Sequence, residues 1–176
     1  MKAIVSAWAG ALSLALVAVP SLAHATGPTD AQIAAIVVTA NQVDIDAGKL
    51  AKGHAQSKDV QAFAQTMITD HSGVNKSATD LVHRLKVKPE PNATSESLKK
   101  GGDENIAALK KLKGSTFDRA YVAHEVEYHQ TVLDAMDKTL IPGARNDELK
   151  ALLVKVRPAF VAHLEHAKSL QTQLGK

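Results

Sequence analysis

Cysteine is absent from the 176-residue chain. This absence excludes disulfide bonds, and it also excludes Fe–S clusters, c-type haem and metal sites built from thiolates. The fold must therefore depend on its apolar core or on a bound ligand. If a metal is bound, its ligands must be imidazole, carboxylate or carbonyl groups.

Aromatic residues are few, at 3% of the sequence, and the only tryptophan, Trp8, lies near the amino terminus. Proteins that bind single-stranded nucleic acid usually stack the bases on aromatic side chains, and nucleic-acid-binding domains carry clustered basic residues. Here the formal net charge is only +3, and acidic and basic residues are interleaved along the chain. We therefore expect no nucleic-acid partner.

Only one long apolar run is present, and it lies at the amino terminus. Met1 and Lys2 give a positive start, residues 3–19 are almost wholly apolar, and Ala23-His24-Ala25 has the A-x-A pattern of a cleavage site. This arrangement is typical of a secretory signal peptide, with an uncleaved membrane anchor as the alternative. We expect a signal peptide at 1–25, one domain at 26–176 without a further membrane span, and a periplasmic or secreted protein.

The rest of the chain predicts four long helices, because apolar residues recur with the 3.6-residue period of one helix face. The first begins after a capping box formed by Thr29 and Gln32. The second is capped by Ser57 and ends near Arg84, because Pro89 follows shortly after. The connection between these two helices is short, which favours an antiparallel pair.

The third and fourth helices form a second predicted pair. A capping box at Ser115 and Asp118, after Gly114, opens the third helix, which ends at Ile141–Gly143. The fourth helix covers Asp147–Leu174 and contains Pro158, which removes a backbone hydrogen bond to the carbonyl of residue 154 and should kink the helix.

A long crossover, 87–114, joins the two pairs and is predicted to hold a short helix at 103–112, after Gly101 and Gly102. No segment shows the alternation of a strand. The sequence therefore predicts an all-α, antiparallel four-helix bundle with the crossover between helices 2 and 3 packed outside it. Bundles with one long connection include the ferritin-like folds.

Each of the four apolar stripes carries one polar residue near its middle: Asp44, His71, His129 and His163. At a rise of about 1.5 Å per residue, the four could share one layer or be spread over two turns. One alternative is that the histidines are core residues bonded to neighbours. Imidazole and carboxylate ligands together suit Zn, Cu, Fe or Ni. The affinity of such a site for its metal should fall as the pH drops through about 6 to 5, because free imidazole becomes protonated there.

Four further residues near this set are weaker candidates. Glu125 precedes His129 by one turn and could be a ligand or could orient its ring. His166 follows His163 by three residues and could be a second ligand or a surface group. Asp70 precedes His71 and points away from that stripe, so exposure to solvent or a contact with a neighbouring helix is at least as well supported as ligation. Met67 is one turn from His71, and we expect it to pack in the core rather than to bind copper or haem.

Four stretches carry a resemblance to a known family: "VDIDAGKLA", "VQAFAQTMITDHS", "GSTFDRAYVAHEVEYHQTVLDAM" and "RPAFVAHLEHAKSL". The chain resembles, over 29–170, an exported bacterial ferritin-like family of unknown function (domain of unknown function 4142), often described as predicted outer-membrane proteins. The resemblance implies the fold and no established reaction. It also implies a carboxylate on the first helix and histidines on the other three, which match Asp44, His71, His129 and His163; glutamate is commoner at the position of Asp44.

The leading hypothesis is an exported bundle that binds a transition-metal ion through core histidines. The alternatives are a structural or interaction bundle without metal, a metal-dependent redox enzyme, and a b-type haem protein; a homodimer is a further option. No HExxH motif or glycine-rich phosphate loop is present. The residues three before the core histidines are Ile68, Val126 and Phe160. Di-iron ferritins place Glu-x-x-His pairs on two helices, so a ferroxidase is not expected.

Overall fold

The computed structural model describes residues 27–175, and these residues are helical with no strand among them. None of the described helices is long and apolar enough to cross a membrane. The predicted signal peptide, 1–25, lies outside the described residues. The elements are α1 (Asp30–His54), α2 (Lys58–Arg84), α3 (Ala93–Leu109), α4 (Gly114–Ala135), the π-helix η1 (Met136–Leu140), α5 (Ile141–Gly143) and α6 (Asp147–Leu174).

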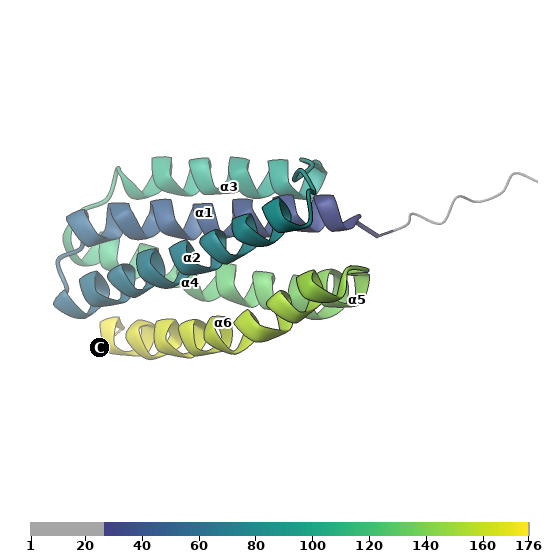
Figure 1. Ribbon diagram of the computed structural model, residues 1–176. Coiled ribbons are helices and arrows are strands. Elements are labelled where there is room, and N and C mark those ends of the chain that lie inside the picture. Colours follow the sequence, from purple (N-terminus) through teal and green to yellow (C-terminus); the bar gives the residue numbers. More distant parts are fainter. Residues whose placement is uncertain (1–26, 176) are drawn as a thin grey trace, which may run out of the picture.

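Four long helices, α1, α2, α4 and α6, pack side by side around a shared core (Figure 1). Residues 55–57 join α1 to α2, and residues 144–146 join the continuous α4–η1–α5 segment to α6. The two hairpins meet because α2 packs against α6 and α1 packs against α4. The crossover between the hairpins carries α3, which lies along the outer side of α1. The all-helical prediction is confirmed.

Local capping signals place the starts of α1 and α2 where the sequence predicts them. The backbone N–H of Gln32 donates to Thr29 Oγ1 at 3.2 Å, and that of Thr29 donates to Gln32 Oε1 at 3.1 Å. This reciprocal pair satisfies two amides that the first turn of α1 cannot use. The hydroxyl of Ser57 likewise accepts from the N–H of Val60 at 3.4 Å.

The predicted capping box of the third helix is wrong. α4 begins at Gly114, and its N-cap residue, Lys113, makes no capping bond with its side chain. The buried carboxylate of Asp118 instead accepts from the backbone N–H groups of Gln56 at 2.9 Å and Ser57 at 2.8 Å, in the turn before α2. Two charge-assisted bonds at the positive end of another helix stabilise this side chain more than one local cap would.

The other hairpin uses the same device. The carboxylate of Asp30, at the start of α1, accepts from the N–H groups of Arg145 at 2.8 Å and Asn146 at 3.0 Å, just before α6. Each hairpin turn is therefore fixed by an aspartate from a helix of the other hairpin. These two contacts hold the hairpins in register, which is a condition for side chains on four helices to meet at one height.

Pro158 lies inside α6 without ending it. Proline has no N–H, so the carbonyl of Val154 loses its helical partner, and α6 is bent along its length (Figure 1). Val154 is 52% exposed, so this side of the helix faces water, which can hydrate the freed carbonyl.

The crossover helix is longer than predicted. α3 covers Ala93–Leu109, so it begins ten residues before the predicted start at 103, and it contains the Gly101-Gly102 pair that was expected to precede it. Gly102 lies against α1, where a Cβ atom would be 2.7 Å from Cγ2 of Val43. Tertiary packing therefore selects glycine here, and it overrides the low helix propensity of the pair.

This contact gives a prediction about stability. The substitution Gly102→Ala should lower the free energy of unfolding by about 1–3 kcal/mol. The added Cβ would clash with Val43, which is β-branched and cannot move its methyl groups aside. Gly101→Ala is the matched control, since a Cβ there meets nothing within 4 Å. It should be neutral or stabilising by up to about 1 kcal/mol. Urea unfolding measures both variants, and equal midpoints would contradict the packing argument.

The apolar core is divided into two clusters along the helix axes. On α1, one cluster contains Ile33, Ile36 and Val37, and the other contains Ala47 and Ala51. The same division occurs on each of the other three helices, where the first cluster includes Leu81, Leu133 and Phe160 and the second includes Phe63, Tyr121 and Ala167. A layer of polar side chains lies between the clusters.

Candidate metal centre

Six buried polar side chains form the layer between the two apolar clusters. None of them is more than 6% exposed, and every helix of the core contributes at least one: Asn41 and Asp44 from α1, His71 from α2, Glu125 and His129 from α4, and His163 from α6. The four residues predicted from the apolar stripes therefore share one layer. Helical spacing explains the additions, because Asn41 and Glu125 lie one turn from Asp44 and His129 on the same faces.

The three histidines form a nearly equilateral triangle. Their ring centroids are separated by 5.5 Å for His71–His129, 5.3 Å for His71–His163 and 5.5 Å for His129–His163. One ring nitrogen from each lies within 4.8 Å of one from each of the others. A second group within the same limit joins His129 to carboxylate oxygens of Asp44 and Glu125. The layer therefore offers three imidazoles and two carboxyl groups, in two groups of potential ligands that share His129.

The hydrogen bonds of His71 define which of its nitrogens is free. Nδ2 of Asn41 donates to the carbonyl of Val37 at 2.7 Å, so the amide oxygen faces His71 and accepts from its Nδ1 at 2.7 Å. This network assigns the proton to Nδ1 and leaves a lone pair on Nε2. Nε2 is buried without a hydrogen-bond partner, and it lies 3.5 Å from Oδ2 of Asp44.

The other two histidines follow the same pattern. Nδ1 of His129 donates to the backbone carbonyl of Glu125 at 3.0 Å, and Nε2 of His163 donates to the carboxylate of Asp70 at 2.9 Å. The remaining nitrogens, Nε2 of His129 and Nδ1 of His163, are buried and have no partner. Histidines that bind metals almost always donate their second nitrogen to a carboxylate, carbonyl or similar acceptor in this way.

The two carboxyl groups of the layer hold their protons more strongly than usual. Burial raises the pKa of Glu125 to about 8, although the nearby side chains of Asp44 and Tyr121 oppose the rise. Burial first, and then the charge of Glu125, raise the pKa of Asp44 well above its usual value. Neither oxygen of Glu125 has a hydrogen-bond partner. Glu125 is therefore mostly protonated at neutral pH while no cation is bound, and Asp44 keeps its proton to a higher pH than a free aspartate does.

Two of the histidines, in contrast, are held neutral. Burial, followed by the neighbouring histidines His129 and His163, lowers the pKa of His71 to about 2. Burial also lowers the pKa of His129 to about 4, although its bond to the Glu125 carbonyl opposes the shift. Both lone pairs are available at neutral pH, and the neutral imidazole is the form that binds metals.

The weaker sequence candidates fall in different places. Glu125 lies in the layer, whereas His166 is exposed, its ring edge-on to Phe63 at 5.1 Å, and is not brought to the triangle. Asp70 bonds to His163 on the neighbouring helix, and Met67 packs in the second apolar cluster. Sequence reasoning missed Asn41, whose signal is its position on the buried face of α1, four residues after Val37 and three before Asp44.

Comparison with known proteins adds a family without a named activity. A family model described as "Domain of unknown function (DUF4142)" matches residues 17–170, a range that contains all six side chains of the polar layer. No curated protein and no solved structure matches the chain. Because the family match covers most of the sequence, the chain belongs to the family of the domain of unknown function DUF4142.

Proposed function

We propose that this protein is an exported metal-binding protein that holds a transition-metal ion in its core. His71, His129 and His163 would supply ring nitrogens, and Asp44 and Glu125 would supply carboxylate oxygens. One observation carries the proposal. Each buried imidazole has one nitrogen bonded to an acceptor and the other without a partner, and one nitrogen of each ring lies within 4.8 Å of one from each of the other two rings.

A purely structural role for these histidines accounts poorly for the unpaired atoms. Five of the eight buried side-chain atoms without a partner among residues 27–175 belong to the layer: three imidazole nitrogens and both oxygens of Glu125. Each unpaired buried polar atom costs about 1–3 kcal/mol, and such atoms are normally rare and scattered. The three histidines form one group of potential metal ligands, and Glu125 belongs to a second group that shares His129 with the first.

The charges of the layer fit a divalent ion. Three neutral imidazoles and two carboxylates, once these have lost their protons, carry a charge of about −2. A divalent cation then makes the buried layer neutral, which removes the large cost of burying an uncompensated charge. Mixed imidazole and carboxylate ligands suit Zn, Cu, Fe or Ni. The lack of Glu-x-x-His pairs still argues against an iron-storing ferroxidase.

We further propose that α1, α2, α4 and α6 form a four-helix bundle of ferritin-like topology, and that the protein acts in the periplasm or outside the cell. The long crossover between two short-turn hairpins supports the topology. The apolar residues 3–19 followed by Ala23-His24-Ala25 support export. Export also fits a site without thiolates, because oxidising compartments would convert cysteine ligands to disulfides.

Metal analysis of the exported protein tests the proposed function. Protein purified without a histidine tag from the periplasm should carry about one equivalent of transition metal, as measured by inductively coupled plasma mass spectrometry. Its intact mass should correspond to a chain that begins at Thr26. The combined variant His71→Gln, His129→Gln and His163→Gln should lose the metal, because no lone-pair nitrogen remains in the layer.

The matched control replaces three exposed histidines, His54→Gln, His83→Gln and His166→Gln, and should keep the metal. Circular dichroism verifies that both combined variants remain helical. A wild-type protein that is isolated metal-free, and that retains no Zn, Cu, Ni or Fe after incubation and dialysis, would contradict the proposal.

A further inference from the structure

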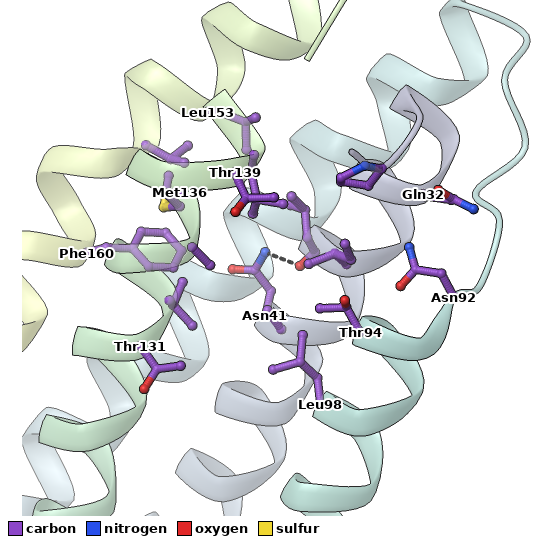
Figure 2. A pocket seen from close by; sticks show the side chains of 18 of the residues that line it. Gln32, Asn41, Asn92, Thr94, Leu98, Thr131, Met136, Thr139, Leu153 and Phe160 are labelled. Carbon is purple, nitrogen blue, oxygen red and sulfur yellow. Dashed lines mark hydrogen bonds between the residues drawn. The ribbon is translucent and has the colours of Figure 1, made fainter. Parts of the chain in front are cut away.

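A pocket beside the polar layer lies between α1, α3, the α4–η1 segment and α6. Its volume is about 500 Å³, within the roughly 300–1,000 Å³ that small-molecule sites occupy. Figure 2 shows Met136, Leu153 and Phe160 on one side, and Thr94 and Leu98 of α3 on the opposite side. The lining is mostly apolar, and the crossover helix supplies the wall that closes the pocket over α1.

One wall of the pocket is the π-helix. Met136, Thr139 and Leu140 of η1 line the pocket, so the wider turn lies where the pocket is formed. Such turns insert an extra residue into an α-helix, are costly to keep, and occur frequently at functional sites. A core that needed only to be filled would be served better by a continuous α-helix.

The charge of the lining limits what the pocket can hold. None of the residues that line it is Asp, Glu, Lys, Arg or His. A charged ligand would lose its water without gaining a partner, which is strongly unfavourable. Two amides also line the pocket: the oxygens of Gln32 and Asn92 accept capping bonds from the backbone N–H groups of Thr29 and Ser95, so their NH2 groups are the ones left to donate to a ligand oxygen.

The pocket also reaches the residues around the histidine triangle. Asn41 and Phe160 both line it, and both contact His71: the amide oxygen of Asn41 at 2.7 Å from Nδ1, and the ring of Phe160 at 5.0 Å between centroids. A molecule in the pocket would therefore contact Asn41 of the polar layer and lie one side chain away from His71. A random packing defect has no reason to end at the residue that orients a histidine.

We propose that this pocket binds an uncharged small molecule with an apolar body and a neutral acceptor oxygen directed toward Gln32 and Asn92. The apolar lining supplies affinity by burying the body of the ligand. The lack of charged groups disfavours ions, and the two amide donors favour a ligand that carries an acceptor oxygen. This proposal does not depend on whether the layer holds a metal.

Fluorescence titration of the 176-residue protein with N-phenyl-1-naphthylamine tests the pocket. This uncharged probe should bind saturably, at one molecule per chain, with chelator present throughout. The sulfonated probe 8-anilino-1-naphthalenesulfonate, which has a similar aromatic frame and a negative charge, should bind at least tenfold more weakly. Ala135→Phe, which fills the pocket, should weaken binding of the uncharged probe at least tenfold.

Ala123→Phe is the matched control, because Ala123 is exposed on the same helix and does not line the pocket. It should leave the dissociation constant within twofold of wild type. Thr139→Phe, from η1, is a second pocket variant if Ala135→Phe unfolds, as judged by circular dichroism. The proposal is overturned if the uncharged probe does not saturate, if the sulfonated probe binds equally well, or if a folded pocket variant binds like wild type.

Discussion

Addition of one of Zn, Cu, Ni or Fe to the chelator-treated protein should raise its melting temperature by roughly 5–11 °C. An ion that binds only the folded chain stabilises it by about 2.7 kcal/mol when free metal exceeds the dissociation constant a hundredfold. Each kcal/mol raises the melting temperature of a domain of about 150–250 residues by roughly 2–4 °C. Differential scanning calorimetry with each metal, and with chelator, measures the shift.

Single substitutions in the triangle should abolish most of this rise. His71→Gln, His129→Gln and His163→Gln each remove one lone-pair nitrogen while keeping a polar side chain of moderate size. Each variant is compared with its own chelated baseline, so any loss of intrinsic stability does not enter the result. The exposed controls His54→Gln and His83→Gln should show the full rise. Identical melting temperatures for wild type with chelator and with every metal would leave the histidines as structural residues.

Helix boundaries could be predicted from the sequence wherever a local contact decides them. The capping box of Thr29 and Gln32 involves residues three apart, and it forms as predicted. The predictions were wrong where a contact between residues far apart in the sequence determines the local structure. Asp118 turns from its own helix to the amides before α2, and Gly102 is selected by Val43 of another helix. Neither partner can be recognised from spacing along the chain.

The candidate site divides in the same way. Periodicity alone placed Asp44, His71, His129 and His163 on inward faces, because the apolar stripe defines each face. Periodicity did not determine the positions of these side chains along the helix axes, because an error of two residues at a helix end moves a side chain by about 3 Å. The roles of Asn41 and Asp70 depend on cross-helix distances of 2.7 and 2.9 Å, which no sequence pattern encodes.

Burial of the polar layer changes the pH dependence that we expect for metal binding. Sequence reasoning predicted a loss of affinity through about pH 6 to 5, as free imidazoles gain protons. In the structure, burial lowers the pKa of His71 to about 2 and that of His129 to about 4, so these rings stay neutral in that range. The competing protons belong instead to Glu125, whose pKa burial raises to about 8, and to Asp44.

Metal affinity should therefore rise with pH between about 6 and 8, by roughly tenfold per pH unit for each carboxyl proton that the metal displaces. The sign follows from the raised pKa, because below pH 8 the folded protein without metal holds a proton on Glu125 that binding must release. Glu125→Gln has no such proton, so its affinity should be lower at pH 8 and should depend less steeply on pH, by about one proton.

Competition with a chromophoric chelator at pH 6, 7 and 8 measures the affinity, and calorimetry in two buffers of different ionisation enthalpy counts the released protons. Glu127→Gln is the matched control, because Glu127 is exposed on the same helix and should keep the wild-type slope. A wild-type affinity that does not change between pH 6 and 8 would exclude Glu125 as a ligand. The same slope in Glu125→Gln as in wild type would exclude Glu125 alone and assign the displaced proton to Asp44.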